Sequence, residues 1–151
     1  LQGDASPALP QLAADALPGT RLADMQVLVV EDNEVNQMVL EALLQEEGAR
    51  VTLAGNGQEA VEQVCDSGDE AFQVVLMDVQ MPVMDGYAAT REIHALAPTL
   101  PIIGQTAHAF EEEKARCLEA GMVAHIAKPV DPELLVRVIL RHARRPVAVT
   151  Q

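Results

Sequence analysis

Three carboxylates, a hydroxyl and an ammonium group each follow a short apolar run in the sequence. They are Glu31, Asp32, Asp78, Thr106 and Lys128. One such residue after an apolar run is ordinary, because helix caps and loop positions use the same residue types. Four separate runs that all end in this way predict a shared site.

The chemistry that suits this set is phosphoryl transfer. Crowded carboxylates repel one another unless a cation lies among them. Oxygen-rich sites of this kind favour Mg²⁺, which keeps several waters and takes one or two carboxylates plus phosphate oxygens. A carboxylate beside the metal can act as the nucleophile on phosphorus. The Lys128 ammonium and the Thr106 hydroxyl would then bind and neutralise the phosphoryl oxygens.

The elements that must position these residues are short strands alternating with amphipathic helices. The apolar runs are Gln26–Val30, Val51–Ala54, Val74–Met77, Ile102–Gln105 and Ala124–Ala127. Strands this short and apolar suit a sheet that is covered on both faces. Strict alternation predicts a doubly wound α/β fold with a parallel sheet and right-handed crossovers. Functional groups in such folds gather at the carboxyl ends of the strands, where the five residues fall.

Apolar period and caps predict three of the helices. The first should end at Gly48 and bury Val35, Met38, Val39, Ala42 and Leu43. The second carries Ala60, Val61, Val64 and Cys65. The last should be capped by Asp131, begin at Pro132 and bury Leu134, Leu135, Val138 and Ile139. We expect Glu111–Glu113 to form the acidic first turn of another helix, and Asp85 to shape a turn.

Composition excludes several classes of function. The net charge of −13 argues against binding to nucleic acid or to an anionic membrane surface. No apolar stretch approaches the ~20 residues of a membrane span. Cys65 and Cys117 are interpreted as buried free thiols, which fits a reducing, cytoplasmic compartment.

The chain is expected to form one domain. Residues 1–24, Ala-rich and punctuated by Pro7, Pro10 and Pro18, are interpreted as a flexible linker. Residues 25–145 form the domain, and residues 146–151 are a loose tail.

Four segments together resemble the receiver (response-regulator) family. They are Glu31-Asp32, Met77-Asp78-Val79-Gln80-Met81-Pro82-Val83-Met84-Asp85-Gly86, Thr106-Ala107 and Lys128-Pro129. The match extends from about Met25 to Arg144. The resemblance implies the flavodoxin-like, five-stranded receiver fold with strand order 2-1-3-4-5.

The resemblance also implies a metal site and a phosphoryl acceptor. Asp78 would accept the phosphoryl group. Asp32 and Asp78 would bind Mg²⁺ together with the backbone carbonyl of Gln80, and Glu31 would act through bound water. Gln80 and His108 occupy positions that tune the lifetime of the phosphate in receivers.

Other implied roles concern the phosphoryl contacts and the switch. Thr106 and Lys128 would contact the phosphoryl group, and the Lys128–Pro129 peptide bond is expected to be cis. Thr106 would also act in the switch. The family usually carries Tyr or Phe as the switch side chain three residues before the motif Lys, whereas this chain has His125.

The resemblance implies a receiver domain of two-component or phosphorelay signalling. It would take a phosphoryl group from a phosphohistidine and act through protein contacts. The wording of the motifs resembles receivers fused to hybrid sensor histidine kinases, so the chain is expected to be a cytoplasmic part of such a membrane-bound protein, without a kinase domain of its own. Partners would be a histidine kinase or a histidine phosphotransfer domain. A dimer could form through the helix near Glu111, the strand Ala124–Ala127 and the helix after Asp131.

Other classes remain as alternatives. The chain could be a receiver-like docking module that regulates a fused kinase without being phosphorylated, although none of Asp78, Lys128 or the acidic pair is lost. A flavin site would need a phosphate loop where the acidic Glu31-Asp32-Asn33-Glu34 stands. A haloacid dehalogenase-type phosphatase would need Asp at position 80, which is Gln. No kinase-like helix surrounds any of the histidines.

Overall fold

The computed structural model describes residues 21–68, 71–79, 85–107 and 111–144. Five parallel strands form one sheet in the order β2-β1-β3-β4-β5. They are β1 (Gln26–Val30), β2 (Arg50–Ala54), β3 (Val74–Asp78), β4 (Ile102–Thr106) and β5 (Ala124–Ala127). The expected fold class and strand order are therefore confirmed.

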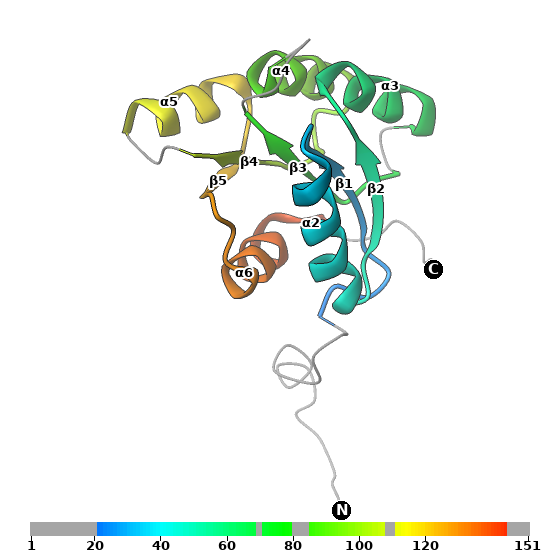
Figure 1. Ribbon diagram of the computed structural model, residues 1–151. Coiled ribbons are helices and arrows are strands. Elements are labelled where there is room, and N and C mark those ends of the chain that lie inside the picture. Colours follow the sequence, from blue (N-terminus) through cyan, green and yellow to red (C-terminus); the bar gives the residue numbers. More distant parts are fainter. Residues whose placement is uncertain (1–20, 69–70, 80–84, 108–110, 145–151) are drawn as a thin grey trace, which may run out of the picture.

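Helices cover both faces of the sheet (Figure 1). They are α2 (Glu34–Glu46), α3 (Gly57–Ser67), α4 (Gly86–Leu96), α5 (Glu111–Ala120) and α6 (Pro132–His142). The helices α3, α4 and α5 lie on one face, and α2 and α6 lie on the other (Figure 1). Neighbouring residues of β3 point to opposite faces: Val75 and Met77 pack under the first group, and Val74 and Leu76 pack under the second. Burial on both faces explains why β3 is apolar without alternation.

The helix ends follow the chemistry of their caps. The side chains of Asn33, Asn56, Asp85 and Asp131 each accept a hydrogen bond from a backbone N–H in the first turn of the following helix. The predicted cap at Asp131 is confirmed, and Asp85 begins α4 as its cap. Gly48 follows the end of α2 with φ of 91°, a conformation that favours glycine, as predicted from its position.

The predicted buried face of α2 is wrong for four of its five residues: Leu43 packs against the core, but Ala42 is exposed, as are the three residues at its start. Leu40 and Leu44 are buried against the sheet, whereas Val35, Met38 and Val39 are 66%, 67% and 51% exposed. Apolar residues occupy more than one side of this helix, so its period alone could not identify the side that packs. The helix therefore exposes an apolar strip, which we define as Val35, Met38 and Val39.

Two smaller predictions about burial also need correction. Cys65 is exposed on α3, although Cys117 is buried as expected. On α6, Leu134 is 43% exposed, and the neighbouring Val136 is buried in its place. The acidic first turn at Glu111–Glu113 and the start of α6 at Pro132 agree with the sequence.

The packed structure begins before residue 25, so the interpretation of residues 1–24 as linker does not hold for residues 21–24. Leu22 is fully buried among side chains of the α2 and α6 layer. Its backbone N–H donates to the carbonyl of Glu47 at 2.8 Å. Residues 1–20 and 145–151 lie outside the described part.

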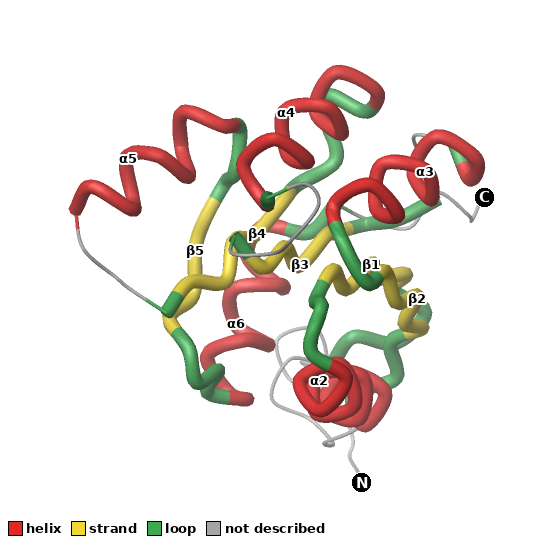
Figure 2. The backbone as a smooth tube through the Cα atoms, turned by 45° about the horizontal axis from the view of Figure 1, so that its top comes forward, coloured by secondary structure: helices red, strands yellow, loops and turns green. Residues whose placement is uncertain are grey.

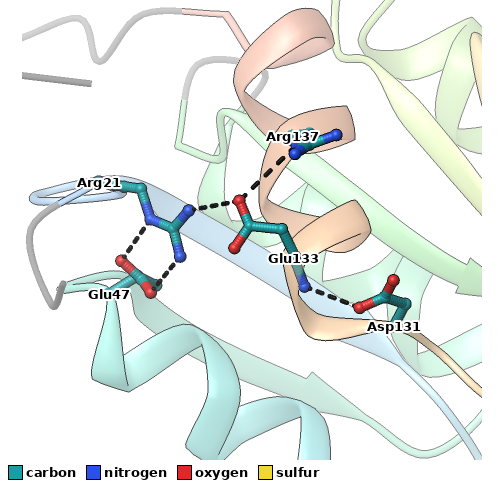
Figure 3. Close-up of polar contacts among 5 residues, drawn as sticks. All are labelled: Arg21, Glu47, Asp131, Glu133 and Arg137. Atoms are coloured by element: carbon teal, nitrogen blue, oxygen red, sulfur yellow. Dashed lines mark hydrogen bonds and ion pairs between the residues drawn. The ribbon is translucent and has the colours of Figure 1, made fainter. Parts of the chain in front are cut away.

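Arg21 ties this entry segment to two helices (Figure 3). Its Nε and Nη2 donate to the two carboxylate oxygens of Glu47 at 3.1 and 2.8 Å, and its Nη1 donates to Glu133 at 2.9 Å. Arg137 approaches the same Glu133 oxygen at 3.7 Å (Figure 3). The two carboxylates raise the pKa of Arg21. A bidentate Arg–carboxylate contact has a defined geometry. Because Arg21 contacts Glu47 and Glu133 at once, it links the end of α2 to the start of α6.

We expect Arg21→Ala to lower the melting temperature by about 3 °C or more, because it removes a bidentate pair that joins segments far apart in sequence. Arg137→Ala is the matched control, since Arg137 contacts the same Glu133 from a side chain that is 73% exposed. Exposed pairs of that kind contribute little, so its melting temperature should change by about 1 °C at most. Equal shifts in both variants, measured by circular dichroism, would contradict the structural role of Arg21.

Candidate functional site

Three carboxylates meet at the carboxyl edge of the sheet. One oxygen from each of Glu31, Asp32 and Asp78 lies within 4.8 Å of the others. Asp78 ends β3 and is 2% exposed, and Glu31 directly follows β1 and is 1% exposed. Asp32 is exposed, so the cluster has one side open to solvent. The structure therefore brings together the three acidic residues that the sequence singled out.

Lys128 reaches this cluster from the loop after β5. Its Nζ lies 3.1 Å from Asp78 Oδ2 and 3.5 Å from Glu31 Oε1. Its backbone N–H donates to the carbonyl of Thr106 at 2.8 Å, which fixes the loop against the end of β4. The Lys128–Pro129 peptide bond is cis. The single ammonium group offsets part of the negative charge of the cluster.

Polar side chains and backbone of the following segment hold Glu31 in place. The backbone N–H of Asn33 donates to Glu31 Oε2 at 3.2 Å, and Asn36 Nδ2 lies 3.5 Å from the same oxygen. Gln37 Nε2 donates to the carbonyl of Glu31 at 2.6 Å. The start of α2 therefore orients the first acidic residue of the site.

Burial is the main cause of an electrostatic imbalance at Glu31. Burial raises the pKa of its carboxyl group, and the negative charge of Asp78 raises it further, while Lys128 and the N–H of Asn33 act in the opposite direction. A carboxylate held under such repulsion gains from a cation. The three carboxylates, with water able to approach Asp32, fit a small hard cation such as Mg²⁺.

Close backbone packing sets the end of β3. A Cβ atom on Gly86 would lie 2.4 Å from the carbonyl oxygen of Asp78 and 2.6 Å from Val79 Cα, so only glycine fits there. The N–H of Gly86 donates to the carbonyl of Val79 at 3.2 Å. This contact brings the start of α4 against the strand that ends in Asp78, which explains the Asp85-Gly86 pair of the sequence motif.

The other predicted site residues lie around the same edge, where described. Thr106 ends β4 and is fully buried. His125 lies on β5 beside Gly104 of β4 and is half-buried. Gln80 and His108 lie outside the described residues, so their predicted roles have no structural account. Figure 2 shows the loops that follow β1 and β5 and lead into α2 and α6.

Three polar residues near the site are not among those that the sequence predicted. Asn36 and Gln37 hold Glu31, and their position in the first turns of the helix that follows it was the available signal. Gln105 is 1% exposed on β4 next to Thr106, at the end of the apolar run Ile102–Gln105. A polar residue inside a strand that is buried on both faces was the signal for it.

Comparisons with known proteins agree with this geometry. The response regulator receiver domain family matches residues 27–140. The sensor histidine kinase RcsC of Escherichia coli (strain K12) is 39% identical over 137 residues, which are 87% of this chain and 14% of RcsC. The chain therefore spans about 14% of the length of this relative.

Solved structures show the same similarity. The receiver domain of the sensor histidine kinase PA1611 from Pseudomonas aeruginosa PAO1, with a magnesium ion coordinated in its active site cleft, is 43% identical with a TM-score of 0.70, over 80% of this chain and 98% of that one. The co-crystal structure of the Saccharomyces cerevisiae histidine phosphotransfer protein Ypd1 with the receiver domain of Ssk1 gives a TM-score of 0.73 at 30% identity, over 80% and 90% of the two chains.

The fold and the acidic site define a receiver domain of two-component signal transduction, of the kind found in hybrid histidine kinases and phosphorelay proteins. The chain belongs to the response regulator receiver domain family. Within the described residues, no helix is both long enough and apolar enough to span a membrane.

We expect Glu31→Gln to stabilise the protein in Mg²⁺-free buffer at neutral pH. The folded-state pKa of Glu31 is raised, so the folded chain binds the proton more tightly than the unfolded chain. Stability is therefore lost as pH rises from the unfolded pKa through the folded one, and the glutamine variant avoids this loss. Its melting temperature should rise by about 4 °C, corresponding to ~1 kcal/mol.

The control for this prediction is Glu62→Gln, which removes the same charge from an exposed position on α3. It should leave the melting temperature and its pH dependence nearly unchanged. The gain from Glu31→Gln should shrink as the pH is lowered through the range where Glu31 takes up its proton. A gain that is independent of pH, or one equal to that of the control, would contradict the prediction.

Proposed function

We propose that Asp78 accepts a phosphoryl group from a phosphohistidine and that this reaction requires Mg²⁺. The observation that carries the proposal is the position of the Asp78 carboxylate, buried at the end of β3 with Lys128 Nζ at 3.1 Å and two further carboxylates beside it. The magnesium ion in the cleft of the PA1611 receiver supports the metal assignment.

Each residue would have a defined part in the transfer. A carboxylate oxygen of Asp78 forms a bond to phosphorus, the bond from phosphorus to the histidine nitrogen breaks, and the electron pair stays on the imidazole. Lys128 and the Thr106 hydroxyl bind the phosphoryl oxygens as their charge changes. When bound, Mg²⁺ neutralises charge between the carboxylates and the phosphoryl group. Asp32 and Asp78 would hold it directly, with Gln80 supplying its carbonyl and Glu31 acting through water.

The alternative of a docking module without phosphorylation has less support. It would leave two buried carboxylates and an ammonium group in close contact with no function to maintain them. Buried charges that repel each other are unfavourable in a site with a purely structural role.

Partners would be a histidine kinase or a histidine phosphotransfer domain, because these proteins carry the phosphohistidine of the proposed reaction. The apolar strip of α2 lies beside the site and is suited to such a contact. The Ypd1–Ssk1 co-crystal structure supports a partner of this kind.

We also propose that the parent protein is a hybrid sensor histidine kinase, with this domain in the cytoplasm.

A dimer through the face of α5, β5 and α6 is a further proposal. Leu118 on α5 and Leu134 and Leu140 on α6 are 63%, 43% and 43% exposed, so both helices carry apolar side chains that are available for a contact. The net charge of −13 makes binding to nucleic acid or to anionic lipid unfavourable.

The central prediction is that Asp78 alone is phosphorylated. Incubation with acetyl phosphate and Mg²⁺ should add one phosphoryl group, which mass spectrometry locates on Asp78. Asp78→Asn should abolish the label, because an amide oxygen is a poor nucleophile, and chelation of the metal should do the same. Asp32→Asn should lower the Mg²⁺ affinity about tenfold or more, the usual effect of altering a metal site.

The matched control is Asp66→Asn, an exposed carboxylate near the end of α3. It should label as the unaltered chain does. Persistent labelling of Asp78→Asn would show that the acceptor is another residue, and full labelling without metal would remove the role of Mg²⁺. Unchanged Mg²⁺ affinity in Asp32→Asn would show that Asp32 is not a ligand.

A further prediction concerns the switch. We expect the Thr106 hydroxyl to move toward the phosphoryl group on Asp78. Thr106 pairs in register with Ala127 of β5, and His125 lies two residues earlier on the same strand. The space that Thr106 leaves should allow the His125 side chain to change its conformation. Addition of beryllofluoride should therefore shift the His125 ring signals in NMR spectra. In Thr106→Ala the ring signals should stay fixed although Asp78 still labels with acetyl phosphate. Ring shifts of equal size in both proteins would contradict a switch through Thr106.

A further inference from the structure

Gln105 is a polar residue in a strand whose residues are all buried, where apolar side chains are the usual choice. It lies on β4, is 1% exposed, and pairs in register with Asp78 of β3 and Ile126 of β5. Side chains alternate along a strand, so Gln105 points to the same face as Ile103, the face covered by α2 and α6. In-register neighbours share a face, so Gln105 lies directly beside the proposed phosphoryl acceptor.

The carboxamide of Gln105 has an unused donor. Its Nε2 is buried and makes no hydrogen bond within the described residues. A buried donor without a partner destabilises the folded state, whereas Leu or Met at this position would fill the same volume without that penalty. The structure therefore keeps a donor that does not contribute to its stability, which points to a function.

A cavity adjoins the Gln105 side chain. It has a volume of about 490 Å³, and Gln105 forms part of its lining. Val39 and Leu40 of α2 line one side, and Pro129 and Val130 of the loop after β5 line the other. Apolar walls with a few convergent polar groups are typical of binding pockets, and here Asn36, Gln105 and the charged Glu31 and Lys128 also line the cavity. The chemistry of the cavity suits an apolar group that carries a hydrogen-bond acceptor.

The cavity borders both the phosphoryl site and the apolar strip. Glu31 and Lys128 contribute to its lining and also form the charge cluster around Asp78. Val39 belongs both to the cavity wall and to the exposed strip of α2. A protein that covers the strip while presenting a phosphohistidine to Asp78 would therefore lie over the mouth of the cavity.

We propose that this cavity receives a side chain of the phosphoryl-donor protein, an apolar group with an acceptor oxygen, and that Gln105 is the residue that recognises it. This inference rests on the proposed function and adds a specificity determinant to it. Gln105 acts in recognition of the donor protein and takes no part in the transfer at Asp78. A small phosphoryl donor, which fills no cavity, should be insensitive to the residue at this position.

The first test measures the chemistry of the cavity with two small probes of similar size. Cyclohexanone carries an acceptor oxygen and benzene does not. In titrations followed by NMR, cyclohexanone should shift the side-chain amide signals of Gln105 and the backbone signals of Val39 and Val130. In Gln105→Leu its affinity should fall about fivefold, the effect of losing one hydrogen bond, while benzene should bind as well or better.

Gln105→Met serves as a second variant of nearly the same shape, and thermal melts of both variants establish that they fold. Each should be at least as stable as the unaltered chain, because the unpaired donor has gone. Absence of saturable shifts, shifts at other residues, or an unchanged affinity of cyclohexanone in both variants would overturn the proposal.

The second test separates recognition from chemistry. Labelling by acetyl phosphate should be unchanged in Gln105→Leu and in the presence of saturating cyclohexanone. Transfer from phosphorylated Ypd1, used as the protein donor, should be slowed by cyclohexanone in the unaltered chain through a higher KM. Inhibition of both reactions would assign Gln105 to the chemistry of Asp78 and overturn its role in recognition.

Two other results have equally defined meanings. Transfer from Ypd1 that is indifferent to saturating cyclohexanone, while acetyl phosphate still labels Asp78, would show that the donor protein does not use the cavity and would overturn the proposal. Failure of acetyl phosphate to label the unaltered chain would instead contradict the proposed function itself.

Discussion

The repulsion between Glu31 and Asp78 is the constraint around which the rest of the site is arranged. Both carboxylates are buried at the edge of the sheet, and burial together with the charge of Asp78 raises the pKa of Glu31. Lys128 contacts both, but one positive charge cannot balance two negative charges together with the exposed Asp32. The site is therefore electrostatically incomplete by itself, and a cation together with a phosphoryl group is the chemistry that completes it.

Each member of this cluster depends on a different part of the fold. Glu31 is oriented by the first turns of α2, and Asp78 sits where Gly86 allows α4 to approach β3. Lys128 is tied to Thr106 across the ends of β5 and β4. Arg21 links the end of α2 to the start of α6 through Glu47 and Glu133, and α6 is the helix that follows the Lys128 loop. The positions of the charges thus depend on the packing of helices on both faces of the sheet.

The α2 helix has one side that packs against the sheet and another that exposes an apolar strip. Leu40 and Leu44 pack against the sheet, while Val35, Met38 and Val39 stay exposed beside the acidic site. An exposed apolar strip next to a strongly charged centre offers a partner both a contact surface and a charge to recognise. The cavity that Val39 shares with Gln105 extends this surface into the interior.

The sequence by itself determined the α/β alternation, the caps at Asp131 and Gly48, and the gathering of Asp78, Thr106 and Lys128 at one edge, because these follow from local patterns and from the geometry of parallel sheets. It did not determine which side of α2 is buried, that Leu22 belongs to the core, or that Gln105 is buried beside Asp78. These features arise from contacts between residues far apart in the chain. When apolar residues occupy several sides of a helix, only the sheet against which the helix packs selects the side that is buried.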